Sequence, residues 1–401
     1  MARIIVCGYM IRYPLSGMLF AYFHYVLGLR RLGHEVFYLE ESGWPGSCYD
    51  PVARDHGDDP ARGLDAVRAL MSEHEIDVPI AYVNRDSGAV FGAEWEDVKR
   101  SLASCDLLLD IGGVCWLPEF RLARRRALID LDPFFTQVGR FANESLEEHH
   151  VHFTYGVNIG SPGSTIPTRG IDWRPTVPPV VPEVWQGQRG AGDAAAGQAG
   201  DAPFTTVANW SAYGGITHAG KRYGQKDEEF LRLVDLPRHA RQRLEIAISG
   251  GDRHVRERLS SAGWLLRDAG EVSSSTPVYK DYIARSRGEF SVAKNAYVET
   301  RSGWFSDRSV CYLAAGRPVV LQDTGFTDWL PPRPGVLAFS GLDEAVAALE
   351  RADVDHALHS SGARQLAEET FGYRVVLPRL VESALKDGRA PESPFDREGG
   401  P

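Results

Sequence analysis

The feature that most constrains this chain is a repeated alternation of short apolar runs with longer segments of helical spacing. Near the N-terminus, the run Ile4–Gly8 precedes a helical pattern over Leu19–Leu32, and Glu35–Leu39 is the next run. Runs of this length are typical of buried strands, and strands that alternate with helices pair in parallel through right-handed crossovers. The chain is therefore expected to be an α/β protein.

The same alternation continues through both halves of the chain. In the first half it predicts helices over 63–74 and 94–104 and strands over Asp106–Ile111 and Ala127–Leu131. In the second half, the expected strands are Phe204–Ala208, Leu244–Ile248, Gly288–Ala293 and Pro318–Leu321. The expected helices there are Lys226–Leu233, His254–Ala262, Tyr279–Ser286, Ser309–Ala315, Asp343–Leu349 and His356–Glu369.

The segment between the two halves is the least able to form a core. Residues 175–182 are proline-rich and therefore stiff, and 186–202 are rich in Gly, Ala and Gln without a large apolar side chain. A chain of 401 residues also suits two domains better than one. We expect two Rossmann-like parallel-sheet domains, over 1–182 and 204–385, with a flexible linker over 183–203 and a polar tail over 386–401. The strands' carboxyl ends would face a cleft between the domains.

Composition excludes several classes of protein. The net charge of −10 disfavours nucleic acid as a partner, and no apolar stretch reaches the roughly 18 residues of a membrane span. The N-terminus lacks the pattern of a signal peptide. The five cysteines are scattered and form no CxxC pair, which predicts reduced thiols in a cytoplasmic protein without structural zinc. The oligomeric state has no sequence signal, and a homodimer stays open.

The most informative segment for chemistry is 289–326. Ser306 and Asp307 are suited to cap a helix that begins with Arg308 and ends at Gly316. A helix N-terminus attracts phosphate through its free N–H groups and its dipole, and Arg308 would add a forked donor. The strand that follows releases the polar loop 322–326 at the same edge, where it can meet sugar hydroxyls.

This segment resembles the donor-binding region of GT-B glycosyltransferases, which use nucleotide sugars. The resemblance lies in SGWFSDRS and GRPVVLQDTGF over 302–326, and in GHEV at 33–36. It implies that a nucleotide diphosphate is contacted by Ser306, Asp307, Arg308 and Ser309. It further implies that the donor sugar is contacted by Asp323, Thr324, Gly325 and Phe326, and the nucleotide by Ser249, Gly250 and Gly251. Neither a metal nor a cofactor is expected, since the helix and Arg308 take the place of the metal.

The sequence departs from the family pattern at two places. Cys311 stands where many retaining enzymes carry a Glu, and the loop Tyr9–Gly17 lacks the His of many inverting enzymes. We favour inversion of the anomeric centre. Two rival functions stay open: a nucleotide-sugar epimerase on the same fold, and a non-catalytic sugar-binding subunit.

Further candidates follow from position along the chain. Lys226, at a helix start, and Lys294, at a strand end, are within the part expected to hold phosphate. The base that deprotonates the acceptor must lie within hydrogen-bond reach of its hydroxyl. The candidates for that base are Asp132, His24, Glu119 and His152. Aromatic segments at 9–25 and 44–49 suggest that the acceptor is a small molecule of bacterial secondary metabolism.

Overall fold

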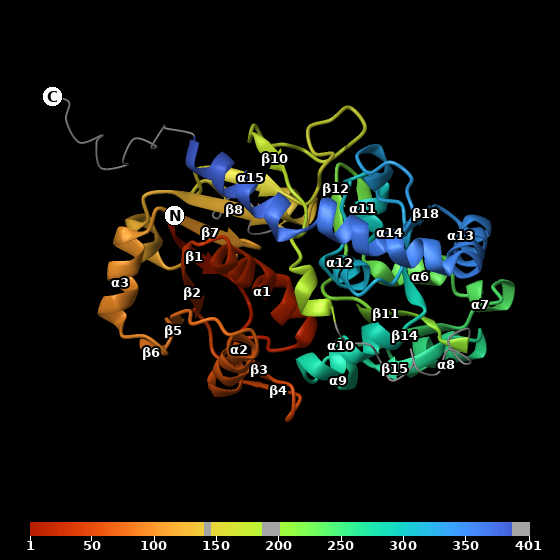
Figure 1. Cartoon of the computed structure of the whole chain (residues 1–401), viewed down its shortest axis with the longest axis horizontal. Helices are drawn as coiled ribbons and strands as arrows, with labels where there is room; N and C mark the ends of the chain where they lie inside the picture. The colour runs from red at the N-terminus through yellow and green to blue at the C-terminus, as the bar shows by residue number, and fades with distance from the viewer. Residues whose placement is uncertain (140–145, 187–200, 387–401) are drawn as a thin grey trace.

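The computed structural model describes residues 1–139, 146–186 and 201–386, and it places two α/β units side by side (Figure 1). Within the described ranges, the first unit has an eight-stranded sheet. Its strand order is β10 (Trp173–Pro175), β9 (Val151–Thr154), β8 (Arg126–Asp130), β7 (Leu107–Ile111), β1 (Arg3–Cys7), β2 (Glu35–Ser42), β5 (Ile80–Asn84) and β6 (Ala89–Phe91). All neighbouring pairs are parallel except β5 and β6.

Helices and one hairpin connect these strands. They are α1 (Ser16–Arg31), the hairpin β3 (Cys48–Asp50) and β4 (Asp55–Gly57), α2 (Ala61–Glu73), α3 (Trp95–Ser104), η1 (Pro118–Leu122), α4 (Phe135–Val138) and η2 (Pro182–Trp185). The central strands are apolar on both faces because helices cover both faces, so that Ile4 to Cys7 are at most 1% exposed.

The second unit has a sheet that is parallel throughout. In the described part of the chain its six strands run in the order β15 (Leu265–Asp268), β14 (Leu244–Ser249), β11 (Phe204–Asn209), β16 (Gly288–Ser291), β17 (Val319–Gln322) and β18 (Val336–Phe339). Its other elements are the hairpin β12 (Ile216–His218) and β13 (Lys221–Tyr223), α6 (Lys226–Arg232), α7 (Leu236–His239), α8 (Arg253–Ser261), α9 (Ala269–Val272), α10 (Thr276–Arg285), α11 (Asn295–Glu299), α12 (Asp307–Ala314), η4 (Phe326–Asp328), α13 (Leu342–Val354) and α14 (His356–Glu369).

The alternation read from the sequence is confirmed. Every predicted strand and helix is present, with ends that differ by a few residues. The sequence analysis missed β5, β15 and β18, which are short runs of four or five residues. It also missed the last helix, α15 (Tyr373–Lys386), because Pro378 lies inside it and proline normally ends a helix.

Helix α15 belongs by sequence to the second unit but packs on the first. Figure 1 shows it, in blue, lying over the strands of the first unit. Gly28 of α1 allows this close approach, because a Cβ at that position would lie 2.6 Å from Leu377 Cδ1 and 2.9 Å from Tyr373 Cβ. The backbone carbonyl of Ala384 accepts a hydrogen bond from Arg125, 2.7 Å away. The domain expected over 204–385 therefore contributes its last helix to the packing of the first unit.

The expectation of a flexible linker over 183–203 is wrong at its beginning. Val184 and Trp185 of η2 are buried in the core of the first unit, next to His24 of α1. Two apolar side chains in an otherwise polar stretch are enough to fix this turn. Most of the remaining linker (187–200) and nearly all of the expected polar tail (387–401) lie outside the described residues.

The two units are in direct contact at several points. Ser16, at the start of α1, donates through its backbone N–H to the carbonyl of Ser273, 3.1 Å away. Lys280 of α10 pairs with Glu73 of α2 at 3.0 Å. Arg54 in the β3–β4 hairpin pairs with Asp268 of β15 at 3.2 Å, and Figure 1 shows this hairpin beside α9 and α10. In the described residues, no helix is both long and apolar enough to cross a bilayer.

Candidate functional site

An ion pair between Asp132 and Lys294 joins the two units. Asp132 follows β8, at the carboxyl end of the first sheet, and Lys294 lies between β16 and α11 in the second unit. The Lys294 ammonium is 2.8 Å from Oδ1 and 2.9 Å from Oδ2 of Asp132. Two residues proposed from the sequence for different roles, and 162 positions apart, therefore meet at one point between the units.

Aromatic side chains enclose this ion pair. The hydroxyls of Tyr213 and Tyr297 both donate to the Asp132 carboxylate, and Tyr213 also accepts from Lys294 at 2.7 Å. The ammonium lies 4.7 Å from the ring centre of Tyr213, 5.3 Å from that of Tyr297 and 4.9 Å from that of Phe135. Burial, together with the negative charge of Asp132, raises the pKa of Tyr297 well above its ordinary value. The hydroxyl therefore stays a donor to the carboxylate.

Lys226 lies beside this cluster at the start of α6. The backbone N–H of Asn295 donates to the carbonyl of Gln225 at 3.2 Å, which holds the beginnings of α6 and α11 together. Burial lowers the pKa of Lys226 to about 7, and the positive charges of Arg308 and Lys294 add to the effect. Across the described ranges, no carboxylate pairs with the Lys226 ammonium. The charges of Glu289 and Asp307 favour the ammonium form of Lys226 but do not offset the effect of burial and of the two cations.

Arg308 does not lie on the outer surface, but its guanidinium is already engaged inside the second unit. Its Nε donates to Glu289 at 2.6 Å, and its terminal nitrogens donate to the Val207 carbonyl at 2.8 Å and to the Ser291 hydroxyl at 2.6 Å. Burial alone would lower the pKa of Arg308, but the Glu289 carboxylate raises it above its ordinary value. The expectation that Arg308 offers a free fork to phosphate is therefore corrected. The residue fixes α12 to the ends of β11 and β16.

The start of α12 has the predicted cap. The Ser306 hydroxyl accepts from the Arg308 backbone N–H at 3.2 Å, and Asp307 Oδ1 accepts from the same group at 2.9 Å. Ser306 and Ser309 line a cavity of about 10 Å³ at the ends of β16 and β17, and the Ser309 hydroxyl has no hydrogen-bond partner there. This space holds about one water molecule and is far too small for a sugar.

The 323–326 loop is held by its own contacts. The Asp323 carboxylate accepts from the Gly325 N–H and the Thr327 hydroxyl, each at 2.8 Å, and the Thr324 hydroxyl donates to the Trp304 carbonyl at 2.6 Å. Phe326 is buried against Phe305. The loop is therefore a packed corner, and the prediction that all four residues reach a donor sugar is not supported for Asp323, whose oxygens are used within the loop.

Asn158 of the first unit binds this same corner. Its side-chain amide donates to the carbonyl of Gly325 at 2.9 Å and to that of Arg301 at 3.1 Å. Gly325 has a φ of +86° and lies so close to Asn158 that a side chain would not fit. The contact fixes the relative position of the two units next to the predicted donor site.

Ser249 and Gly250 lie at the exposed carboxyl end of β14, as predicted. The Ser249 carbonyl accepts from Trp210 N–H at 3.0 Å, and Gly250 and Gly251 have φ values of +70° and +69°. Because these two glycines have no side chains, the backbone of the loop is accessible at the edge where the carboxyl ends of β11 and β14 meet.

Two of the four candidate bases, His24 and His152, are held inside the fold as neutral rings. His24 is fully buried between Val181 N–H, 3.2 Å away, and the Trp185 indole, 3.3 Å away, and burial lowers its pKa to about 3. The ring of His152 is held by the Leu146 carbonyl at 2.7 Å, and burial lowers its pKa to about 4. Glu119 is half-buried in η1, and no contact of the described structure links it to Asp132. Of the four candidates, Asp132 is the one that forms an ion pair with a cation of the second unit.

The sequence analysis did not find Tyr213, Tyr297, Phe135 or Asn158. None stands in a motif, and their partners lie far along the chain, as with the 81 positions between Tyr213 and Asp132. Asp132 and Lys294 each directly follow a predicted strand. Because the carboxyl ends of parallel strands are where ligands bind, the sequence pattern selects both residues for a physical reason. Nothing comparable marks the aromatic residues.

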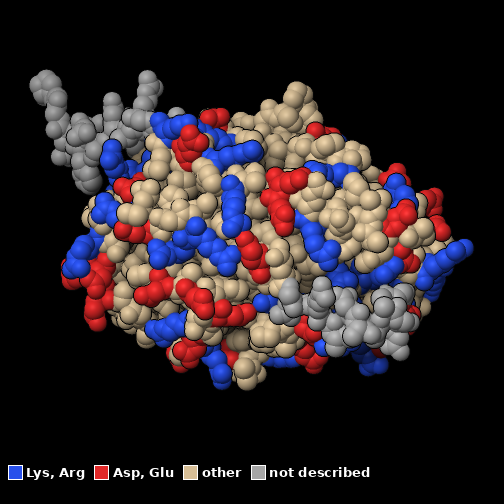
Figure 2. Space-filling view, in the orientation of Figure 1, with Lys and Arg blue, Asp and Glu red and all other residues tan. Residues whose placement is uncertain are grey.

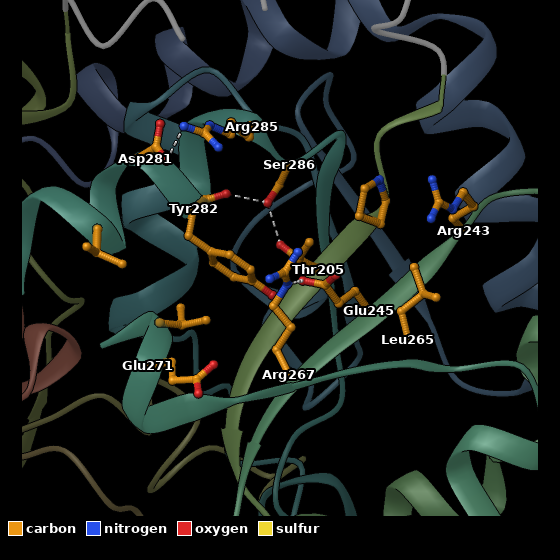
Figure 3. A pocket seen from close by; sticks show the side chains of 13 residues that line it. Thr205, Arg243, Glu245, Leu265, Arg267, Glu271, Asp281, Tyr282, Arg285 and Ser286 are labelled. Atoms are coloured by element: carbon orange, nitrogen blue, oxygen red, sulfur yellow. Dashed lines mark hydrogen bonds and ion pairs between the residues drawn. The ribbon is translucent and has the colours of Figure 1, made fainter. Parts of the chain in front are cut away.

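A second cavity, of about 400 Å³, lies at the opposite end of the second sheet (Figure 3). It opens at the amino ends of β11, β14 and β15, whereas ligands of parallel sheets bind at the carboxyl ends. Two of its arginines are paired within the lining: Arg267 with Glu245 at 3.1 Å, and Arg285 with Asp281 at 2.8 Å. It is not the site that the Asp132–Lys294 cluster marks.

On the face in view, acidic and basic side chains are interspersed, with no large field of one sign (Figure 2). All five cysteines are buried and unpaired, as the sequence analysis predicted. In the part of the chain that the structure describes, no three His, Cys, Asp or Glu side chains are grouped so as to hold a metal ion.

Comparisons with known proteins identify the fold. No family model and no curated protein matches this chain. Among solved structures, AviGT4, a glycosyltransferase involved in avilamycin A biosynthesis, is 15% identical over 96% of this chain and 97% of its own, with a TM-score of 0.53. HepE from Anabaena, solved with UDP and glucose, is 12% identical over 96% and 99%, with a TM-score of 0.56. An alpha-glucosyltransferase, solved with UDP and a 13-mer DNA, is 9% identical over 96% and 99%, with a TM-score of 0.58. The predicted GT-B fold is thereby confirmed.

Proposed function

We propose that this protein transfers a sugar from a nucleotide-diphosphate donor, with UDP or dTDP as the nucleotide, to a small-molecule acceptor. One observation carries the proposal: Lys226 and Lys294 converge at the junction of the two units, and Lys226 has no carboxylate partner within the described residues. A pyrophosphate is the dianionic group that suits two neighbouring ammonium groups beside a helix N-terminus. The structural neighbours that were solved with UDP support this choice of donor.

In this proposal the second unit stabilises the leaving group. Lys226, Lys294 and the amino end of α12 face the oxygens on which negative charge develops as the bond to the sugar breaks. Arg308 acts indirectly, by fixing α12 through Glu289. The chain's own cations provide the compensating charge.

Asp132 is the proposed base. In the present arrangement its carboxylate is paired with Lys294. When the pyrophosphate takes Lys294, the carboxylate is released to accept the proton of the acceptor hydroxyl. The acceptor oxygen then bonds to the anomeric carbon from the side opposite the pyrophosphate, the carbon–phosphate oxygen bond breaks, and the nucleoside diphosphate leaves. This single displacement inverts the anomeric configuration.

The units must separate to admit the donor. The cavity beside Ser306 and Ser309 holds about one water molecule, and the Asp132–Lys294 and Asn158–Gly325 contacts join the two units. Closure after binding would exclude water and so protect the donor from hydrolysis. For the acceptor we propose a secondary metabolite in the cytoplasm, as the part of AviGT4 in avilamycin A biosynthesis suggests.

The test is calorimetric titration of UDP-glucose and dTDP-glucose into the wild type, Lys226→Ala and Lys294→Ala. We expect one of the two donors to bind the wild type and to bind each variant at least about tenfold more weakly, a loss of about 1.4 kcal/mol. Arg238→Ala, on the surface of the second unit, is the matched control and should bind normally. Absence of binding by both donors, or equal binding by all variants, would refute the proposal. NMR of the donor incubated alone separates transfer from epimerisation, because only an epimerase converts it without an acceptor.

A further inference from the structure

Arg12 has unsatisfied hydrogen-bonding capacity in the interior of the first unit. Its side chain is 0% exposed, and its Nε lies 3.3 Å from Glu40 Oε1. Among the residues that the structure describes, neither of its terminal nitrogens has a hydrogen-bond partner. Buried guanidinium nitrogens are normally hydrogen-bonded, because leaving them unpaired in a medium of low dielectric costs free energy.

The neighbouring carboxylate cannot fill this vacancy by a small rotation. Glu40 already accepts hydrogen bonds from the Ile11 N–H at 2.8 Å, the Arg12 N–H at 2.6 Å and the Tyr38 hydroxyl at 2.7 Å. These bonds fix the carboxylate against the backbone of the loop and against the Nε of Arg12. The terminal nitrogens therefore remain available as a planar fork, held in one orientation.

Two aromatic faces cover that fork. The carbon of the guanidinium lies 4.0 Å from the ring centre of Tyr9 and 5.2 Å from that of Trp44. Tyr9 is partly buried, whereas Trp44 is 40% exposed and packs on Trp116 with ring centres 5.9 Å apart. Trp44 is thus the more exposed of the two rings that lie over the guanidinium.

The loop that carries Arg12 belongs to the junction of the two units. It follows β1, at the carboxyl end of the first sheet, and it ends at Ser16, which is bound to Ser273 of the second unit. The ring of Tyr9 is 6.5 Å from that of Tyr22, and the Tyr22 hydroxyl lies beside Gly112 at the end of β7. Arg12 therefore lies at the carboxyl edge of the first sheet, the edge that also carries Asp132.

We infer that Arg12 is a binding site for an oxyanion of the acceptor, a carboxylate or a phosphate, which enters when Trp44 moves aside. The planar fork would hold two oxygens of that group, and the rings of Tyr9 and Trp44 would pack against the acceptor body beside it. The inference rests on the proposed function and narrows it, because it restricts the acceptor to molecules that carry an anionic group.

The experiment compares three probes that share a phenyl ring: benzoate, phenyl phosphate and the neutral benzyl alcohol. Each is titrated calorimetrically into the wild type, Arg12→Lys and Arg12→Met, with UDP-glucose and dTDP-glucose binding and circular dichroism measured on every variant. We expect benzoate or phenyl phosphate to bind the wild type, benzyl alcohol to bind at least about tenfold more weakly, and Arg12→Lys to lose about tenfold in affinity because an ammonium lacks the fork. Arg12→Met should not bind the anions. Whichever anion binds more tightly identifies the source of the oxyanion.

Several outcomes would overturn the inference: no binding of either anion to the wild type, equal binding of benzyl alcohol, or equal binding by both variants. Should Arg12→Met fail to fold, because Glu40 loses its partner, Arg12→Lys decides the question, since it keeps the charge. Donor binding separates the two proposals. Failure of both donors on the wild type refutes the donor site, whereas failure of the anions with normal donor binding refutes the role of Arg12 alone.

Discussion

Lys226 makes the proposed donor site dependent on pH in a direction that can be calculated. Burial, with Arg308 and Lys294 nearby, lowers the pKa of its ammonium to about 7 in the free protein. A bound pyrophosphate stabilises the charged form, so the pKa of Lys226 must rise on binding. Binding at pH values above 7 then requires uptake of a proton, and the affinity for the donor falls as the pH increases.

The size of the effect follows from the fraction of Lys226 that is charged. With a pKa of about 7, this fraction falls from about 90% at pH 6 to about 10% at pH 8, so the Kd for UDP-glucose should rise about tenfold over this range, equivalent to about 1.4 kcal/mol. A nucleotide sugar is the right ligand, because its pyrophosphate diester does not titrate in this range, unlike the terminal phosphate of free UDP.

The assay is calorimetry at several pH values, in buffers of different ionisation enthalpy, which reports both the Kd and the number of protons taken up. If dTDP-glucose is the donor that binds, it replaces UDP-glucose in the same design. Lys226→Arg is the matched control, because a guanidinium stays charged throughout; its affinity should be flat with pH and its proton uptake absent. An equal pH dependence in the wild type and in Lys226→Arg would refute the assignment of this proton to Lys226.

Three further predictions concern other parts of the molecule. Asp132→Asn should lower kcat at least about 100-fold with an acceptor found by screening, without weakening donor binding, and the anomeric configuration of the product, read by NMR, should be inverted; retention would exclude the single displacement. Gly28→Val should destabilise the protein by about 1–3 kcal/mol in urea unfolding, because α15 packs directly on that glycine; Gly17→Ala, whose Cβ would lie 3.8 Å from the Tyr279 hydroxyl, is the control and should be nearly neutral. His24 is neutral in the fold, with a pKa near 3, so between pH 6.5 and 4 the unfolded chain binds a proton that the native state does not, and stability falls as the pH decreases; His24→Phe should reduce this slope by up to about 1.4 kcal/mol per pH unit, and an unchanged slope would contradict the burial argument.

The candidate site was only partly predictable, because a sequence motif reflects interactions between near neighbours in the chain. It carries no record of contacts between residues that are far apart in the sequence. Ser306 was recognised as a helix cap since capping depends on neighbours two or three positions away. Arg308 was assigned to phosphate for the same local reason, but its actual partner, Glu289, stands 19 positions earlier, at the start of another strand. Local spacing identifies which side chains can bind an anion, and it does not reveal which of them the protein uses for its own packing.

The sequence by itself determined the two parallel sheets, since an apolar run that alternates with a helical pattern has one low-energy arrangement, with the run buried between covering helices. It also placed Asp132 and Lys294 at strand ends, where parallel topology brings residues to a common edge. Only the tertiary structure decided that these two meet, that Lys226 forms no ion pair with a carboxylate of the described residues, and that α15 returns to the first unit over Gly28. Those facts depend on how two sheets pack against each other, and side chains that are distant along the chain come together there without any periodic signal in the sequence.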